Sequence, residues 1–298
     1  MRVVVRDWLN ANNVILLRPD YNVVIDTGHA SHAHRTLELL RLPQHLGSAP
    51  LQLIANTHCH SDHMGGNALL ARTYGCPVAV PEGEAAFVRS WDKRALWLDL
   101  TDQRAERFEV GAELGAEQHY LWGGLSWEAI AAPGHDMGAL VFYCEAAQLL
   151  ISGDALWENG FGVLLPDVPG ALKGARNTLD RIAALKVRVV IPGHGQPFTG
   201  VAEALDRCYQ RVDAFQADPA RMARHALKVM LMFTLLERQR LPLSTLSAYM
   251  DGVAVYRDYN RTYLGLTPTA LAQVLVSELE RAGAVERSGG FLRPASSG

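Results

Sequence analysis

Residues 57–67 read Thr-His-Cys-His-Ser-Asp-His-Met-Gly-Gly-Asn, with three histidines and one aspartate inside six positions. The apolar segment 51–56 before them predicts a short buried strand, and the segment from 64 to about 75 predicts a helix. The potential ligands therefore stand at the carboxyl end of a strand, which is where α/β architectures build functional sites.

The spacing within this stretch suits metal binding. In an extended segment His58 and His60 project from the same face, whereas Cys59 points the other way and is not expected to be a ligand. Asp62 and His63 follow at the turn into the helix, so four donors can converge on one place. Imidazole and carboxylate ligands suit zinc first, with iron or manganese allowed. The alternative is a histidine cluster that binds no metal, because a motif on its own is a hypothesis.

Three further donors each follow a β-like run later in the chain, directly after a glycine. His135 follows Pro-Gly, Asp154 follows Ser-Gly, and His194 follows Pro-Gly. Glycine lets the backbone approach a site closely. One such residue alone would be interpreted as a turn or cap residue. Three of them, in this order after the first stretch, indicate one shared site.

In these motifs the chain resembles the metallo-β-lactamase superfamily, specifically its glyoxalase-II-like hydrolases, over roughly residues 1–200. The resemblance implies an αββα four-layer sandwich that binds two metal ions, zinc or alternatively iron or manganese. It assigns the ligands to the two ions as follows: His58, His60 and His135 to one, Asp62, His63 and His194 to the other, and Asp154 to both. Asp62 is also the expected catalytic residue, because its carboxylate can orient the nucleophile or accept its proton.

The rest of the pattern agrees with two sheets covered by helices. The expected strands are 13–17, 21–25, 51–56, 77–80, 126–132, 139–144, 148–152 and 188–191. The expected helices are 33–42, 64–75, one that begins near 81, and 171–185. Residues 91–108 mix tryptophans with charges and are expected to form a helical insertion or lid.

After about residue 203 the strand pattern ends. We therefore expect a catalytic domain over residues 1–203 and a smaller, mainly helical domain over residues 204–298. Amphipathic helices are predicted at 204–216, 222–239 and 268–282, and a hairpin with a glycine turn at 288–290 follows. This order of elements resembles a winged helix.

The C-terminal domain leaves the substrate open. A winged helix suggests nucleic acid, and related members of the superfamily with such an appendage cleave RNA. However, the helix that would read nucleic acid carries Glu278 and Glu280 beside Arg281, where a basic face is normal. Glyoxalase II holds an anionic thiol carrier with basic residues of its C-terminal domain, and by that resemblance Arg257 and Arg261 are expected to bind substrate. The competing interpretation is a polar loop with packed tyrosines.

Aromatic and acidic residues near the motifs give further candidates. Trp157 and Phe161 follow the third block and are expected to line an apolar substrate mouth, whereas Trp91 and Trp97 are assigned to packing. Asp26, which ends the run 21–25, is either an outer hydrogen-bond partner of a ligand histidine or a turn residue.

Bulk properties narrow the class of protein. The 298 residues carry a formal net charge of −3, and 49% of them are hydrophobic, as in an ordinary globular protein. This charge argues against a general nucleic-acid or membrane binder. Four scattered cysteines, no signal-peptide pattern at the start and no apolar run of transmembrane length make the cytoplasm the expected location.

The leading interpretation is a dinuclear metal-dependent hydrolase of a thioester, ester or lactone, acting on a small-molecule substrate. A metal-dependent endoribonuclease or phosphodiesterase is second, so nucleic acid is an alternative partner that is not favoured. A metal-bearing sensor or scaffold with little turnover is third, because fold and ligands do not fix function. No membrane partner is expected, and a homodimer through the C-terminal domain is an alternative use of that domain.

Overall fold

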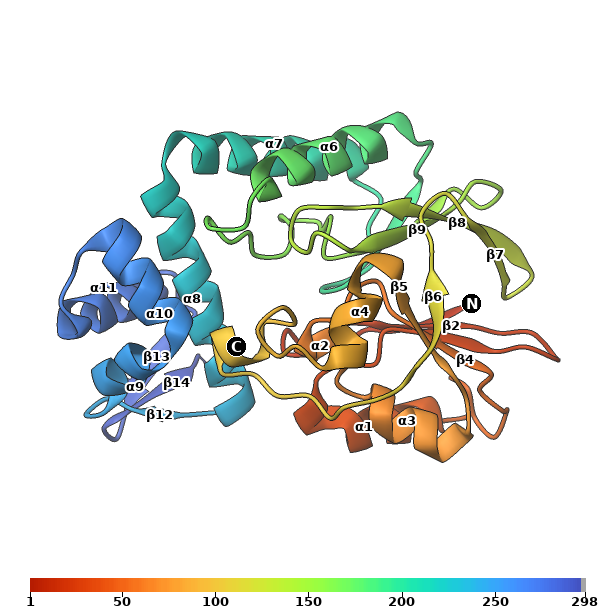
Figure 1. The fold of residues 1–298 in the computed structure, drawn as a ribbon, viewed down its shortest axis with the longest axis horizontal. Helices are drawn as coiled ribbons and strands as arrows, with labels where there is room; N and C mark the ends of the chain where they lie inside the picture. Colours follow the sequence, from red (N-terminus) through yellow and green to blue (C-terminus); the bar gives the residue numbers. More distant parts are fainter. Residues whose placement is uncertain (296–298) are drawn as a thin grey trace.

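A computed structural model describes residues 1–295 and consists of four stacked layers followed by a helical region (Figure 1). Helices α1 (Ala33–Leu40) and α3 (Asn67–Tyr74) cover one side, and α6 (Ala171–Ala184) and α7 (Val201–Ala217) cover the other. Two sheets lie between them. This arrangement confirms the expected αββα sandwich.

The first sheet contains the strands of the first third of the chain in sequence order. Its members are β1 (Arg2–Val4), β2 (Asn13–Leu16), β3 (Val23–Ile25), β4 (Leu53–Ala55), β5 (Val78–Pro81) and β6 (Val110–Leu114). Strands β1 to β3 are antiparallel and β3 to β6 are parallel. Short helices connect these strands: η1 (Ala30–His32), α2 (Ser61–Met64), α4 (Glu82–Ser90) and α5 (Leu98–Thr101).

The second sheet has the strand order β11-β10-β9-β8-β7. Its members are β7 (His119–Trp122), β8 (Leu125–Ala131), β9 (Leu140–Cys144), β10 (Leu149–Gly153) and β11 (Val189–Pro192). Alternate side chains of both sheets meet in a shared core, where Trp127 and Phe142 are fully buried against strands of the first sheet. Separate apolar cores lie under α1 and α3 and under α6 and α7.

Two parallel strand pairs place loops of distant sequence at the same sheet edge. In the first sheet, β3 pairs with β4 so that Ile25 lies opposite Ala55. In the second, β10 pairs with β11 so that Gly153 lies opposite Pro192. Carboxyl ends of parallel strands point the same way, so the residues that follow each pair leave the sheet side by side.

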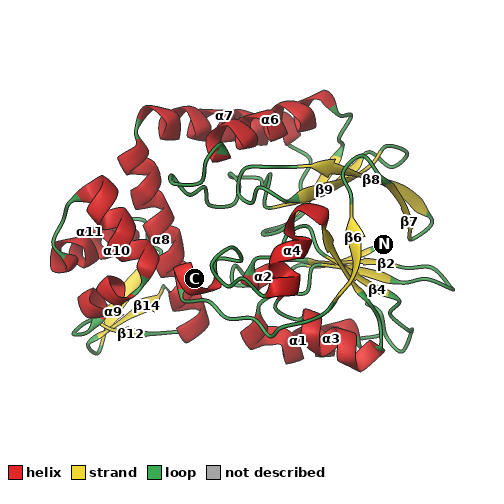
Figure 2. Cartoon of the chain, in the orientation of Figure 1, coloured by secondary structure: helices red, strands yellow, loops and turns green. Residues whose placement is uncertain are grey.

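The C-terminal region is mainly helical, as Figure 2 shows, and holds a small three-stranded sheet of order β12-β14-β13. Its elements are α8 (Pro219–Arg238), β12 (Leu241–Pro242), α9 (Leu246–Gly252), α10 (Ala254–Tyr259), the π-helical turn η2 (Asn260–Leu264), α11 (Pro268–Arg281), β13 (Val285–Ser288) and β14 (Phe291–Pro294). The expected helices and final hairpin are present, and β12, α9, α10 and η2, which were not expected, lie between α8 and α11. Both α8 and α11 begin with a capping side chain and a proline, the combination that favours a helix start.

The expected domain boundary at residues 203/204 falls inside α7. The buried side chains of this helix, among them Leu205 and Val212, pack in the core of the second sheet. The separate core of the C-terminal region begins with Ala223 and Leu227 on α8. The change of core therefore lies near Asp218, where α7 ends and α8 begins. Helical periodicity marks a helix but does not say which core the helix packs against.

The expected helical insertion at 91–108 is largely non-helical, because α5 is the only helix that begins within it in the described chain. Three of its residues, Trp91, Trp97 and Asp102, have left-handed backbone angles with φ of 55°, 58° and 57°. Such angles interrupt a helix. Among residues 1–295, no helix has both the length and the apolarity that crossing a membrane requires.

Gly65 is required by the packing of α2 against the segment before α1. A Cβ atom at this position would lie 2.1 Å from the Ala30 nitrogen and 2.5 Å from the Ser61 oxygen, both backbone atoms. We expect Gly65→Ala to lower the free energy of unfolding by about 3 kcal/mol, the upper end of the usual cost of overpacking. Urea denaturation followed by circular dichroism measures this change.

Gly252→Ala is the matched control, because a Cβ atom there meets open space at the end of α9. This variant should be as stable as the natural protein or slightly more stable. Equal urea midpoints for Gly65→Ala and Gly252→Ala would show that the packing around Gly65 can relax without cost.

Candidate metal centre

All seven expected donors come together at one edge of the sandwich. They follow four different strands: residues 58–63 follow β4, His135 follows β8, Asp154 follows β10 and His194 follows β11. They form two groups, and within each group the potential ligand atoms lie within 4.8 Å of one another. The two groups are His58, His60 and His135, and Asp62, His63, Asp154 and His194.

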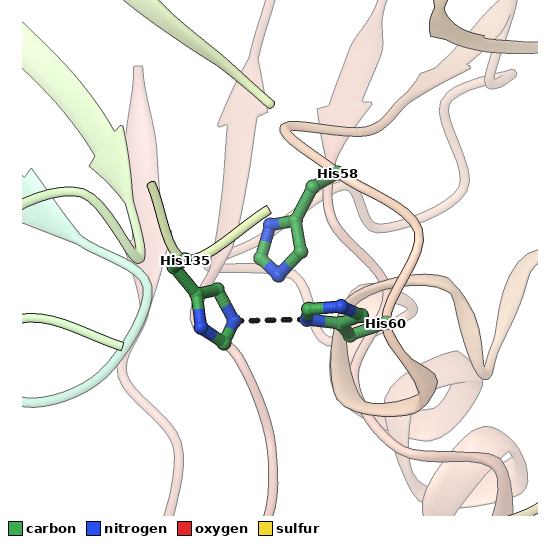
Figure 3. A group of neighbouring side chains, drawn as sticks. All are labelled: His58, His60 and His135. Atoms are coloured by element: carbon green, nitrogen blue, oxygen red, sulfur yellow. Dashed lines mark hydrogen bonds between the residues drawn. The ribbon is translucent and has the colours of Figure 1, made fainter. Parts of the chain in front are cut away.

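The first group consists of three imidazoles turned toward one another, as Figure 3 shows. His60 Nδ1 lies 2.8 Å from His135 Nε2, and the ring centroid of His58 lies 4.6 Å from that of His60. His135 Nδ1 lies 2.6 Å from the Val163 carbonyl oxygen, which can only accept a hydrogen bond. A proton on Nδ1 would leave Nε2 unprotonated, and Nε2 is the atom that faces His60 Nδ1 and could bind a metal.

The second group contains two carboxylates and two imidazoles. His194 Nε2 lies 3.0 Å from Asp62 Oδ2, and His63 Nε2 lies 3.2 Å from Asp154 Oδ1. The other oxygen of Asp154, Oδ2, lies 3.4 Å from His135 Nε2 of the first group. The two oxygens of Asp154 thus face different groups, which is the position of a bridging ligand.

Asp26 lies directly behind the second group and is buried. Its Oδ2 is 2.8 Å from His63 Nδ1 and also accepts a hydrogen bond from Thr57 Oγ1, while Oδ1 accepts one from the Thr57 backbone nitrogen. Of the two interpretations left open by the sequence, the structure gives Asp26 the contact of an outer partner. Such a contact fixes the ring orientation and directs His63 Nε2 toward the other donors.

The donors satisfy a chemical test for metal binding. Among the described residues, four buried ring nitrogens of the centre lack a hydrogen-bond partner: His58 Nε2, His60 Nε2, His63 Nε2 and His194 Nδ1. A buried polar atom without a partner costs about 1–3 kcal/mol. Two of these atoms, His58 Nε2 and His63 Nε2, lie on the side of the ring that faces the other donors. Metal coordination would give them a partner, so the residues present fit bound ions.

The electrostatics of the two groups also fit cations. Burial, together with the neighbouring histidines, holds the pKa values of His58 and His60 well below their usual range, so both rings are neutral ligands. Burial alone would lower the pKa of His63, but the surrounding carboxylates outweigh it and raise that pKa. Burial likewise opposes ionisation of Asp62, yet the adjacent histidines hold its pKa low. The carboxylates of the second group are therefore ionised, and their negative charge would attract a bound cation.

Gly193 is needed for the close approach of β11 to the bridging carboxylate. A Cβ atom at this position would lie 2.3 Å from Asp154 Oδ1. The backbone nitrogen of Gly193 also donates to the Gly153 carbonyl oxygen at 2.7 Å. The glycine that precedes His194 in the sequence therefore has the role expected of it.

A cavity of about 510 Å³ opens onto the donors. Trp97 stacks on the His60 ring at a centroid distance of 4.2 Å, and Trp8 and Trp157 flank the His194 ring at 5.8 and 5.2 Å. The opposite wall comes from α8 and α11, with these apolar members: Val229, Met230, Met232, Phe233, Leu236, Leu279 and Ala282. The C-terminal region therefore closes an otherwise open metal centre.

One of the four expected substrate residues lines the cavity, and the other three do not. Trp157 lines the cavity. Phe161 does not; it is 5% exposed and packs in the core of the second sheet. Arg257 and Arg261 lie on the exposed side of α10 and η2, where both pair with Asp258. Phe161 lies in a core because the whole fold, and not the local sequence, decides which way a loop side chain points. Neither arginine lines the cavity, so a substrate role for these three residues stays a prediction.

Several cavity residues were missed by the sequence analysis. Trp97, assigned to packing, lines the cavity, as does Trp8, which is 56% exposed. The α8 wall left a readable signal, because four of its apolar residues recur at i, i+3, i+4 and i+7: Val229, Met232, Phe233 and Leu236. This stripe adjoins the stripe of α8 that packs in the C-terminal core, and Val229 and Met232 also contact that core. A helix that is apolar on two faces covers two apolar spaces.

Comparison with known proteins agrees with this geometry. The family model of the metallo-β-lactamase superfamily matches residues 6–194. A probable metallo-hydrolase of Methanocaldococcus jannaschii is 27% identical over 191 residues, which are 62% of this chain and 88% of that protein. A hydroxyacylglutathione hydrolase of Pseudomonas entomophila is 32% identical over 145 residues, which are 47% of this chain, and the chain spans only 47% of its length.

A solved structure extends the likeness to the C-terminal region. A metallo-β-lactamase family protein from Thermus thermophilus has 22% sequence identity and a TM-score of 0.56. The match covers 98% of this chain and 97% of that one, so the helical region belongs to the shared fold. The family match, which includes the whole donor set, shows that the chain belongs to the metallo-β-lactamase superfamily of metal-dependent hydrolases.

Proposed function

We propose that the chain is a dinuclear metal-dependent hydrolase of esters, thioesters or lactones that carry a sizeable apolar group. One observation supports this proposal above all others. Five of the seven donors form one end of the 510 Å³ cavity, and the rest of that cavity is largely apolar: the five are His60, Asp62, His135, Asp154 and His194. A reacting bond at the donors would therefore have an apolar neighbour group.

The ligand assignment is part of the proposal. His58, His60 and His135 would hold one ion, Asp62, His63 and His194 the other, and Asp154 both. Zinc suits this nitrogen and oxygen set, with iron or manganese as alternatives. Bound there, the two ions would polarise a carbonyl oxygen and lower the pKa of a water molecule toward neutrality.

The protein's own residues supply orientation and proton transfer. Asp62 Oδ2 lies at the cavity end beside His194, where it can orient a water molecule and accept its proton. In the overall reaction, water's hydroxyl joins the acyl carbon, the C–O or C–S bond breaks, and the proton goes to the leaving alcohol or thiol. Trp8, Trp97 and Trp157 surround the donors with apolar surface, which limits the access of bulk water.

The relatives support an acyl substrate. One set of relatives is named hydroxyacylglutathione hydrolase, and hydroxyacylglutathione is a thioester. The similarity of this chain to these relatives favours a thioester as the bond that is hydrolysed. The endoribonuclease alternative has less support, because Glu278 and Leu279 of α11, and Ala282 directly after it, line the cavity. A helix that closes an apolar cavity does not offer the exposed basic face with which a winged helix contacts nucleic acid. The sensor alternative makes the opposite prediction about turnover, which the following experiments measure.

Loss of the bridging carboxylate should remove metal. We expect two zinc ions per chain in the natural protein and at most one in Asp154→Ala, because both oxygens of Asp154 face donors of the two groups. Turnover should fall by several orders of magnitude while circular dichroism stays unchanged. Metal analysis after dialysis and assays under zinc-replete conditions measure both quantities.

Asp26→Asn is the comparison variant, since it keeps a residue type that tolerates the left-handed φ of 57° and removes the charge and one acceptor oxygen behind His63. Metal affinity or activity should fall by about 10–100-fold, the usual effect of an outer partner. Retention of two zinc ions by Asp154→Ala would exclude that residue from the bridging position.

The length of the acyl group should control the rate. Burial of one methylene contributes about 0.8 kcal/mol, so kcat/KM should rise up to about fourfold per methylene from acetyl to octanoyl thioesters. Val229→Trp, which adds bulk to the α8 wall, should flatten this rise and leave the acetyl substrate almost unaffected. A flat series in the natural protein, with rapid acetyl hydrolysis, would mean that the cavity does not receive the acyl group.

A further inference from the structure

A second cavity, of about 470 Å³, adjoins the first and is lined mainly by cations. Two come from α7 and three from α8: Arg207 and Arg211, and Arg221, Arg224 and Lys228. Glu278 of α11 is the only carboxylate among the lining residues, so the formal charge of the lining is +4. We call this cavity the basic pocket.

The basic pocket is continuous in its lining with the apolar cavity. His225, Lys228 and Glu278 line both. They stand at the end of the apolar cavity made by α8 and α11, whereas the metal donors belong to the sheet-edge loops. The metal donors, the apolar cavity and the basic pocket therefore follow one another in this order.

Only two of these five cations pair with a carboxylate that lines the pocket. Arg207 and Arg211 donate to the backbone oxygens of Glu158 and Asn159, neutral groups in the loop that follows Trp157. Lys228 Nζ lies 2.8 Å from Glu278, and Arg224 lies 3.6 Å from the same carboxylate. Arg221 forms no ion pair within residues 1–295, and its side chain is exposed.

His225 lies beside these cations in the lining of the basic pocket. Burial, reinforced by Arg211, Lys228 and Arg221, lowers the pKa of His225 to about 4. The ring is therefore neutral near pH 7 and can act as a hydrogen-bond donor or acceptor there. Like charges held this close repel one another, and an anion placed among them would remove that repulsion.

We propose that the basic pocket binds a phosphate group of the substrate, which would be an amphipathic ester or thioester with its hydrolysable bond at the metal centre and an apolar body between. A phosphate dianion engages several arginines at once through their paired N–H groups. A single carboxylate would leave most of the five cations without a partner. This inference rests on the proposed function for the bond that is cleaved, but the binding of the anion does not depend on turnover.

Binding measurements test the pocket directly. Isothermal titration calorimetry of the zinc-loaded protein would compare octyl phosphate, octanoate and octanol. We expect octyl phosphate to bind at least about tenfold more tightly than the other two, as one or more charge-assisted hydrogen bonds would give. The double variant R221Q/R224Q should lose about tenfold in affinity for octyl phosphate and keep its affinity for octanol, since Lys228 still pairs with Glu278.

The matched control is R257Q/R261Q, which removes the same charge from the same region, outside both cavities. Its affinity for octyl phosphate should stay within about twofold of the natural value. Equal binding of the three probes, or equal losses in the two variants, would overturn the proposal. Binding of single-stranded RNA that R221Q/R224Q abolishes, with octyl phosphate unaffected, would also overturn it and assign the pocket to a nucleic-acid backbone.

The two proposals can fail separately. Phosphate-selective binding without hydrolysis of any ester or thioester would reject the proposed function and leave the basic pocket in place. The protein could instead hydrolyse acyl thioesters equally fast whether or not the leaving group or the acyl chain carries a phosphate. If R221Q/R224Q behaved in the same way, the phosphate site alone would be rejected.

Discussion

The parallel pairing of β3 with β4 and of β10 with β11 is the constraint on which the site depends. Each pair ends two strands at one sheet edge, so residues far apart in sequence leave the sheets as neighbours. Asp26 thereby reaches His63 on α2, and Asp154 lies beside His194. Neither contact can form from local sequence alone. The sandwich brings the two edges together, and the metal centre occupies the place where they meet.

The buried charges of the centre depend on one another. His63 lies between Asp26 on one side and Asp154 on the other, and it is fully buried. An isolated charge at such a depth would be very costly, whereas a paired and hydrogen-bonded one is tolerated. Divalent ions meet the same demand for positive charge. The arrangement of buried carboxylates and imidazoles thus favours cations that prefer nitrogen and oxygen ligands.

How much the sequence could predict follows from the range of the interactions. The donor set and the αββα layers were predictable, because strand ends, glycines and the spacing of His58 and His60 are local features. The direction of Phe161 was not, since a loop residue points according to the contacts that the whole fold makes available. The same holds for Arg257, which was expected to bind an anionic substrate group but forms an ion pair with the neighbouring Asp258. Long-range packing decided both cases.

Helix α8 shows why the substrate is harder to predict than the metal centre. One face of the helix packs in the C-terminal core with Leu227 and Leu231, and a second, with Met232 and Phe233, lines the apolar cavity. A third face carries the three cations of α8 into the basic pocket. A sequence pattern shows these stripes but not what each one faces. Because a single rigid helix carries all three, the spacing between the metal donors and the basic pocket is fixed by the fold. In the proposed binding mode, a substrate that reaches both the donors and the basic pocket must span the apolar cavity, so the docking of the C-terminal region would set its length.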